Sequence, residues 1–215
     1  MEENLKPIYD SVIKGDATGV KQDVQAAIDT GVDAEDILKQ GLIPAMQKVG
    51  DLFEKGEYYV PEMLISARAM QGGLELLKPL LASAEVQSTG KVILGTVQGD
   101  LHDIGKNLVG MMLEGAGFEL VDLGADVSPK KFAEAVKENQ PDIVAMSALL
   151  TTTMPSMKTT IEALIEAGLR YQIKIMVGGA PVTEEYANSI GADGFAPDAS
   201  RAATLAQRLV EKALI

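Results

Sequence analysis

Apolar side chains follow a helical period over the first 85 residues. The period is interrupted at Gly15, at residues 31–33 and at Gly56, which separate successive segments. Two apolar stripes are formed by Leu42, Ala45, Met46, Val49, Leu52 and Phe53 and by Met63, Ala67, Met70, Leu74 and Leu77. Asp16 or Asp33 suits the N-cap of a helix. We therefore predict four or five helices that pack as a small bundle.

After Gly90 the pattern changes to short apolar runs separated by helical stretches, which is typical of a parallel β-sheet with crossover helices. Strands are predicted at residues 91–97, 118–123, 142–147, 174–178 and around 194–196, and a last helix at 199–214. The predicted fold class is α/β, with an N-terminal helical bundle followed by a flavodoxin-like or Rossmann-like, doubly wound, parallel five-stranded sheet. The predicted domains are residues 1–88 and 89–215, joined by a polar linker at 83–90.

The predicted sheet brings two polar segments together. Sheets of this kind usually have the strand order 2-1-3-4-5 and bind ligands beyond the carboxyl ends of strands one and three. Asp100 and His102 follow the first strand. Ser147 and the threonines at 151–153 follow the third strand. Both segments should therefore line one crevice.

Composition and charge narrow the functional classes. The 215 residues are 47% hydrophobic, which is enough for one large domain or two small ones. No uncharged apolar run of 18 residues occurs, and the acidic start lacks an apolar signal region, so we expect a cytoplasmic protein with no membrane span. The net charge of −12 argues against nucleic-acid binding, because phosphate contacts need clustered Lys and Arg.

His102 is the only histidine of the chain, and there is no cysteine. A zinc site of the His/Cys type needs three or four protein ligands, so this chain cannot build one alone. If His102 binds a metal, something else must supply the other ligands. A macrocyclic cofactor would do so and would leave one axial position to the protein.

Several motifs carry a resemblance to a known family. Asp100-x-His102-x-x-Gly105, Ser147-x-Leu149 and Gly178-Gly179 are similar to the signature of domains that bind cobalamin with its lower base displaced. Residues 49–53, Gly56 and Val60-Pro61 resemble the helical cap of cobalamin-dependent methyltransferases, including the cobalamin-binding module of methionine synthase. Residues 147–155 resemble the small corrinoid proteins of methylamine, methanol and methoxyarene methyltransferase systems.

The resemblance implies a role for each residue of a polar relay. In that family a histidine replaces the cofactor's own base as lower axial ligand of cobalt, and His102 matches its position. Asp100 would accept the other ring N–H and fix the tautomer, as carboxylates do at metal sites. Thr153 would be the third member of the relay, where relatives often have serine.

The resemblance also implies a set of cofactor contacts. They are Phe53 and Val60 over the upper face of the corrin, Gly99, Leu101, Asp103 and Gly105 in the first loop, Ser147, Leu149 and Thr151 in the second, Gly178 and Gly179 as a slot for the nucleotide tail, and Ala199 at its outer end. Some of these residues, taken singly, also have a purely structural explanation. Two glycines also suit a turn that ends a strand, and an apolar stripe also suits core packing.

The resemblance implies a carrier function. The chain is expected to hold a methyl group on cobalt between a substrate-specific methyltransferase and a second methyltransferase whose acceptor is tetrahydrofolate or a thiol. A reductive activating protein is a further expected partner, and the chain alone is not expected to be catalytic. We also expect the cap to move aside during transfer, with residues 83–90 as the hinge.

Three other functions fit the sequence less well. A cobalamin-binding sensor or regulator usually adds a DNA-binding segment, and no basic segment of that kind is visible. The cobalamin-binding part of a carbon-skeleton mutase does not ordinarily carry this helical cap. A response-regulator module needs a phosphoacceptor Asp at the third strand, where this chain has Ser147.

Overall fold

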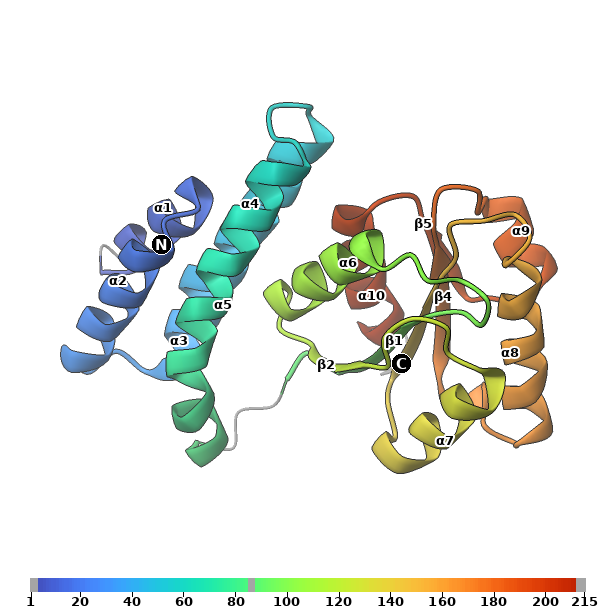
Figure 1. Cartoon of the computed structure of the whole chain (residues 1–215). Coiled ribbons are helices and arrows are strands. Elements are labelled where there is room, and N and C mark those ends of the chain that lie inside the picture. The colour runs from blue at the N-terminus through green and yellow to red at the C-terminus, as the bar shows by residue number, and fades with distance from the viewer. Residues whose placement is uncertain (1–3, 85–87, 212–215) are drawn as a thin grey trace. The chain divides into compact units, whose positions relative to one another are not determined.

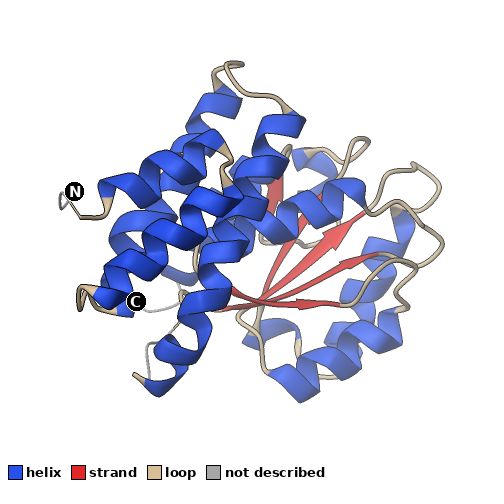
Figure 2. Cartoon of the chain, turned by 60° about the vertical axis from the view of Figure 1, so that its left-hand side comes forward, coloured by secondary structure: helices blue, strands red, loops and turns tan. Residues whose placement is uncertain are grey.

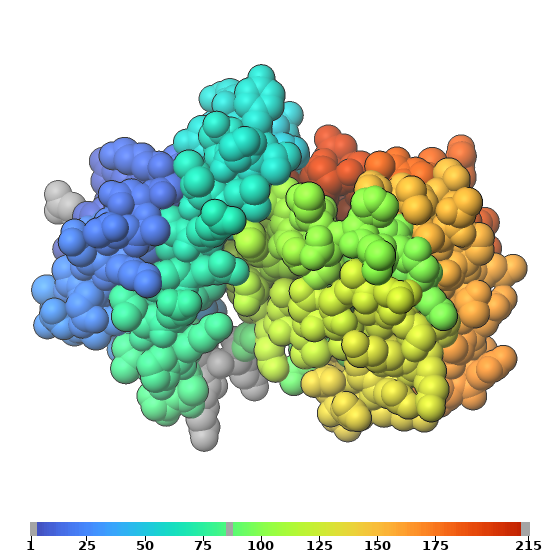
Figure 3. Space-filling view, in the orientation of Figure 1, coloured from blue at the N-terminus to red at the C-terminus, as the bar shows by residue number. Residues whose placement is uncertain are grey.

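A computed structural model describes residues 4–84 and 88–211 of the chain (Figure 1). The chain divides into two compact units, one of residues 1–88 with 114–117 and one of residues 89–113 with 118–215. In Figure 3 the first unit is mainly blue to teal and the second is mainly green to red. Residues 85–87 of the expected linker lie outside the described residues. No helix in the described ranges is long and apolar enough to cross a membrane.

The first unit is helical, as the apolar period predicts. Its elements are α1 (Lys6–Lys14), α2 (Ala17–Asp29), α3 (Ala34–Asp36), the π-helical segment η1 (Ile37–Leu42), α4 (Ile43–Glu54) and α5 (Val60–Ser83). Gly15 ends α1 in a left-handed conformation, and the Asp16 carboxylate caps α2 by accepting a hydrogen bond from the amide of Gly19 at 2.9 Å. Asp33 occupies the N-cap of α3 but makes no side-chain capping bond.

A π-helical segment joins α3 to α4 without a break. Pro44 lies in the first turn of α4 and has no N–H to donate to the carbonyl of Gln40, four residues earlier. The wider π turn before it accommodates a position at which an α-helical hydrogen bond is impossible. The apolar period did not predict the π-helical turn, because Ile37 and Leu42 are buried in it as they would be in an α-helix.

The second unit contains a five-stranded parallel sheet with the order β2-β1-β3-β4-β5. The strands are β1 (Lys91–Thr96), β2 (Glu119–Asp122), β3 (Ile143–Ser147), β4 (Lys174–Gly178) and β5 (Gly194–Ala196). The helices are α6 (Ile104–Gly115), α7 (Pro129–Asn139), α8 (Pro155–Glu166), the 3-10 turn η2 (Arg170–Gln172), α9 (Glu184–Ser189) and α10 (Ala199–Glu211). The predicted fold class and strand order are therefore confirmed. The last predicted helical residues, 212–214, lie outside the described residues.

Helices cover both faces of the sheet (Figures 1 and 2). One face carries α6 and α10, and the other carries α7 and α8, as right-handed crossovers in this strand order require. The central strands β1, β3 and β4 are buried on both faces, which explains why they have continuous apolar runs instead of alternation. All five strands end at one edge, where the loops after β1 and β3 begin.

Gly95 allows the core beneath β1 to close tightly. Phe132 of α7 is fully buried, and a Cβ added to Gly95 would lie 2.8 Å from the tip of its ring. A real Cβ cannot approach another atom so closely, so a side chain at residue 95 would force the ring to move. The absence of a side chain at Gly95 thus makes room for the Phe132 ring.

We predict that Gly95→Ala lowers the free energy of unfolding by about 1–3 kcal/mol, because overpacking outweighs the usual gain from replacing glycine in a strand. Phe132→Leu should also destabilise the protein by creating a cavity. The double variant should lose less than the sum of the two single losses, since each change relieves the other. Urea unfolding of the four proteins measures this, and additive losses would contradict the proposed contact.

Candidate functional site

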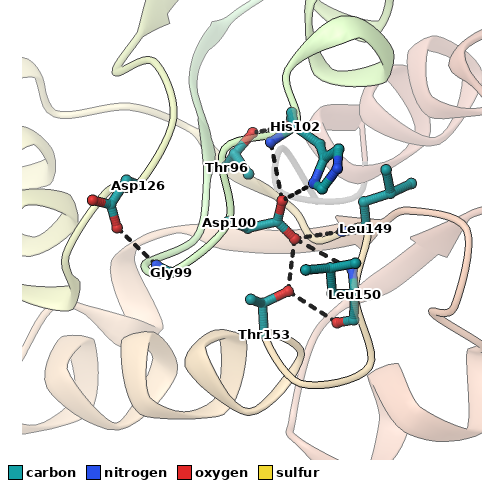
Figure 4. A network of polar contacts seen from close by, with 8 residues as sticks. All are labelled: Thr96, Gly99, Asp100, His102, Asp126, Leu149, Leu150 and Thr153. Atoms are coloured by element: carbon teal, nitrogen blue, oxygen red, sulfur yellow. Dashed lines mark hydrogen bonds and ion pairs between the residues drawn. The ribbon is translucent and has the colours of Figure 1, made fainter.

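The loops after β1 and β3 meet at the carboxyl edge of the sheet. The two strands are neighbours, with Thr96 in register with Ser147, and the amide of Val97 donates to the carbonyl of Ser147 at 3.0 Å. The segment with Asp100 and His102 therefore lies beside the segment that leads to Thr153 (Figure 4). This edge is where open α/β sheets bind ligands.

Asp100 is the centre of the polar network in Figure 4. Its side chain is completely buried. One oxygen, Oδ1, accepts from the His102 amide at 3.0 Å and lies 2.7 Å from His102 Nδ1. The other oxygen, Oδ2, accepts from the Thr153 hydroxyl at 2.6 Å and from the amides of Leu149 at 2.8 Å and Leu150 at 3.3 Å. A buried carboxylate needs such donors, because its loss of water is otherwise costly.

These donors decide the charge of Asp100. Burial alone would raise its pKa, but the hydrogen bonds from Thr153, from the amides of Leu149 and His102 and from the His102 ring outweigh burial and hold the pKa well below its usual range. The carboxylate is therefore ionised at neutral pH and has no proton to donate. It follows that the hydrogen in the Asp100–His102 contact belongs to Nδ1.

The tautomer of His102 directs its other nitrogen outward. With Nδ1 donating to Asp100, a neutral ring carries its lone pair on Nε2. About half of the His102 side chain, 51%, is exposed, and Nε2 has no hydrogen-bond partner among the described residues. An oriented imidazole with an accessible lone pair is the arrangement of a metal ligand supported by a carboxylate.

Other side chains fix the backbone of this loop. Thr96 is buried and donates its hydroxyl to the carbonyl of His102 at 3.0 Å. Ser156 donates to the carbonyl of Gln98 at 3.0 Å, and Asp126 accepts from the amide of Gly99 at 2.7 Å. Sequence reasoning missed Thr96, Asp126 and Ser156. Their only signal is their place near the carboxyl edge of the sheet, which many uninvolved residues share.

Four large apolar residues, which we call the apolar rim, are exposed in the two loops and at the start of α6. Leu101 and Ile104, close to His102 in sequence, are 76% and 78% exposed, and Leu149 and Leu150, whose amides bind Asp100, are each 42% exposed. Exposed apolar residues in the segments that carry a half-exposed imidazole favour a ligand with an apolar surface. Leu101 and Leu149 were predicted as contacts, whereas Ile104 and Leu150 were not.

Gly105, in the first turn of α6, faces open space. Apart from its chain neighbours and the backbone of its own helix, no protein atom lies within 4 Å of the position that its Cβ would occupy, and its backbone does not need a left-handed conformation. Neither packing nor backbone conformation therefore requires glycine here. Asp103, just before α6, accepts from the Asn107 amide at 2.7 Å through its carbonyl, so it helps to start the helix.

The glycine pair at the end of β4 has a reason within the fold. A Cβ at Gly178 would lie 2.8 Å from the carbonyl oxygen of Ala196, and one at Gly179 would lie 1.9 Å from that of Ala148. Gly179 also has a φ of 128°. Neighbouring backbone thus excludes side chains at both positions, and the simple turn interpretation is sufficient for them. A slot for a cofactor tail stays a prediction.

The remaining predicted contacts are dispersed. Ser147 is half-buried at the end of β3, Thr151 is exposed in the following loop, and Ala199 is buried at the start of α10. Phe53 and Val60 belong to the helical unit, where Phe53 is half-buried in α4 and Val60 is 41% exposed at the start of α5. Tyr58 between them donates its hydroxyl to the carbonyl of Ile13 at 3.1 Å, and so holds this turn to the end of α1.

Comparisons with known proteins point to one family. A family profile described as a B12 binding domain matches residues 90–204, and a second profile with the same description matches residues 5–78. The chain is 45% identical over 203 residues to trimethylamine corrinoid protein 2 of Methanosarcina acetivorans, and the match covers 94% of both proteins.

Two solved structures are also similar. The crystal structure of the methanol:cobalamin methyltransferase complex from Methanosarcina barkeri contains a chain with a TM-score of 0.87 and 31% identity, covering 98% of this chain and 80% of that one. A cobalamin-binding protein from Desulfitobacterium hafniense has a TM-score of 0.80 and 35% identity, covering 95% of this chain and 98% of that one.

The Thr153 hydroxyl can be tested on the protein without a ligand. Thr153→Val removes a donor from a buried charge and should lower the free energy of unfolding by about 1.5–3 kcal/mol at pH 7. Thr153→Ser keeps the hydroxyl, loses one methyl group and should cost about 1 kcal/mol.

The decrease in the free energy of unfolding caused by Thr153→Val should depend on pH. Because the folded pKa of Asp100 is lowered, its stabilisation is complete above the unfolded pKa of about 3.9 and is lost as the pH falls below it. The unfolded state is the same in both proteins, so their difference in free energy of unfolding should stay constant while folded Asp100 is ionised in both, and should shrink only below the folded pKa of the variant, which loss of the Thr153 bond raises. Urea unfolding at a series of pH values measures it, and a difference that already shrinks above about pH 4 would count against an ionised, Thr153-bound Asp100.

Proposed function

The chain belongs to the family of corrinoid proteins with B12 binding domains, and we propose from that premise that it carries a methyl group between two methyltransferases, with His102 as the lower axial ligand. Its cofactor is a cobalamin or a related corrinoid, as the sequence resemblance predicted. When bound, this cofactor supplies a cobalt atom that accepts and releases the methyl group. The observation that carries the proposal is the contact between His102 Nδ1 and the buried Asp100 carboxylate.

The residues around His102 fit a corrinoid. Nε2 is the available nitrogen, so it would be the atom that binds the metal. Leu101, Ile104, Leu149 and Leu150 would pack against the macrocycle and lose their contact with water. Gly105 leaves room at the first turn of α6, where a larger side chain would fill the space. These features support a cofactor bound with its own lower base displaced.

Asp100 and Thr153 would orient the ring for ligation. Asp100 is ionised, so it accepts the Nδ1 hydrogen and would keep Nε2 directed towards the metal. Thr153 holds the carboxylate in place with its 2.6 Å hydrogen bond.

Further contacts are proposed from the resemblance. In the first loop, Gly99, Leu101 and Asp103 would lie against the corrin. Ser147 and Thr151 would bind along the nucleotide tail, beside Gly178-Gly179 and towards Ala199. Residues 1–88 would form the cap and 89–215 the cobalamin-binding domain, with Phe53 and Val60 shielding the methyl group. The hinge proposed at 83–90 falls partly outside the described residues.

The proposed partners are a substrate-specific methyltransferase that loads the methyl group, a second methyltransferase that removes it, and a reductive activating protein. The similar chain from Methanosarcina barkeri was solved in a methanol:cobalamin methyltransferase complex, which supports the first partner. The relative from Methanosarcina acetivorans is named for trimethylamine. Because these relatives differ in substrate name, the methyl donor of this chain stays open.

Substitution of the only histidine tests the proposal directly. Wild type and His102→Ala are reconstituted with hydroxocobalamin, passed through gel filtration and compared by ultraviolet-visible spectra. We expect wild type to retain the corrinoid with an imidazole-ligated spectrum, and His102→Ala to show the spectrum of a cofactor without that ligand. Added imidazole should restore the wild-type spectrum, since it replaces the missing side chain.

A matched control is available at Tyr171. Its side chain is 92% exposed in η2, before β4 and thus at the opposite edge of the sheet. Tyr171→Ala should bind and ligate the corrinoid as wild type does. An identical spectrum for wild type and His102→Ala would eliminate axial ligation by His102, and failure of wild type to retain any corrinoid would eliminate the carrier proposal.

Asp100→Ala should weaken corrinoid binding about 10- to 100-fold, the usual effect of removing a carboxylate that supports a metal-bound histidine. The physical reason is that the His102 ring loses its orientation and its fixed tautomer. Equilibrium titration with hydroxocobalamin measures the dissociation constant. Circular dichroism shows whether the variant is folded, because loss of a buried carboxylate with several donors also affects stability. A folded variant with unchanged affinity and spectrum would refute the supporting role.

A further inference from the structure

Asp126 has a backbone conformation that needs an explanation. It lies between β2 and α7 with a φ of 53°, in the left-handed region that residues with a Cβ rarely adopt. Among the described residues, Gln140 with a φ of 47° is the one other non-glycine case. Gln140 is the C-cap of α7, where a left-handed residue commonly ends a helix. Asp126 is not at such a position.

The carboxylate and the backbone amide of Asp126 both bind the loop that carries His102. The Asp126 carboxylate accepts from the amide of Gly99 at 2.7 Å (Figure 4). Its own amide donates to the carbonyl of Asp100 at 3.0 Å. The two bonds hold the Gly99–Asp100 segment at both ends.

The support for Asp126 is itself rigid. On one side of it the Gly124 carbonyl accepts from the amide of Thr96 at 3.0 Å, and on the other the Val127 amide donates to the Thr96 carbonyl at 3.0 Å. The buried Lys106 ammonium binds Asp122 at 2.5 Å, at the end of β2. Asp126 is therefore attached to the sheet on both sides and can fix a neighbouring loop.

We propose that Asp126 is a positioning residue for His102. It fixes the main chain of Gly99 and Asp100. The Asp100 side chain in turn orients the imidazole through its 2.7 Å contact with Nδ1. The inference rests on the proposed function, in which His102 ligates the corrinoid. The left-handed conformation of Asp126 is then explained by the two hydrogen bonds that this residue makes to the loop.

Three substitutions of Asp126 separate the effect of its backbone conformation from the effect of its carboxylate. Asp126→Gly adopts the left-handed conformation freely but has no acceptor for Gly99. Asp126→Asn keeps an acceptor oxygen and a residue type that tolerates this conformation. Asp126→Ala loses the acceptor and keeps the strain. Gln140→Ala is the matched control, since it places alanine in the same backbone conformation at the end of α7, outside the polar network.

The readout is ligation, not activity. Each protein is reconstituted with hydroxocobalamin and reduced to the cobalt(II) form, in which a coordinated histidine nitrogen splits the electron paramagnetic resonance signal. We expect Asp126→Gly and Asp126→Ala to bind the corrinoid about 10-fold more weakly and to show a smaller histidine-ligated fraction. Asp126→Asn and Gln140→Ala should match wild type. His102→Ala provides the signal without histidine ligation.

A second readout needs no cofactor. In the corrinoid-free protein, amide hydrogen exchange at Gly99 should be at least about 10-fold faster in Asp126→Gly, because the amide loses its acceptor, and unchanged in Asp126→Asn. Circular dichroism establishes that each variant is folded. If Asp126→Gly does not fold, the comparison of Asp126→Ala with Gln140→Ala decides the question.

The outcomes separate the two proposals. Wild-type ligation and unchanged Gly99 exchange in Asp126→Gly would overturn the positioning role while leaving His102 as the ligand. Equal losses of ligation in Asp126→Ala and Gln140→Ala would also overturn it, because backbone strain alone would then be the cause. If wild type and His102→Ala give the same signal, the ligand proposal fails, and the role of Asp126 towards it fails as well.

Discussion

A buried negative charge at Asp100 is the constraint on which this site depends. A carboxylate without contact to water is costly unless donors surround it, and here those donors come from the loops after β1 and β3. Satisfying the charge therefore joins two segments that are about 50 residues apart in the chain. The same hydrogen bonds keep the carboxylate ionised and assign the Nδ1 hydrogen of His102. One group thus links the stability of the sheet edge to the chemistry of the imidazole.

The sheet makes this possible because its parallel strands end at one edge. β1 and β3 are adjacent although β2 separates them in sequence, so their loops lie beside each other. Rigid strands and buried threonine and aspartate groups fix the loop, whereas Leu101, Ile104 and His102 remain exposed. A fixed backbone with exposed apolar groups suits a large, flat cofactor, since little reorganisation is needed when it binds.

The glycines show why a motif alone does not give the reason for a residue. Gly178 and Gly179 are required by nearby backbone carbonyls, whereas Gly105 meets no protein atom and Gly95 makes room for Phe132. The sequence alone does not distinguish the reasons for these four glycines. Their reasons differ because they depend on what lies opposite each residue in space, which is a property of the packed fold.

The sequence by itself determined the helical unit and the five strands, because the apolar period is a local and regular signal. The usual strand order of such sheets then placed Asp100, His102 and Thr153 near one another, as the structure has them. The sequence did not determine the π-helical segment before Pro44, the contribution of Thr96 and Ser156, or the left-handed Asp126 beside Gly99. These features depend on single hydrogen bonds between distant segments. Only the tertiary structure decided them, since no periodic pattern records which donor will face a particular acceptor.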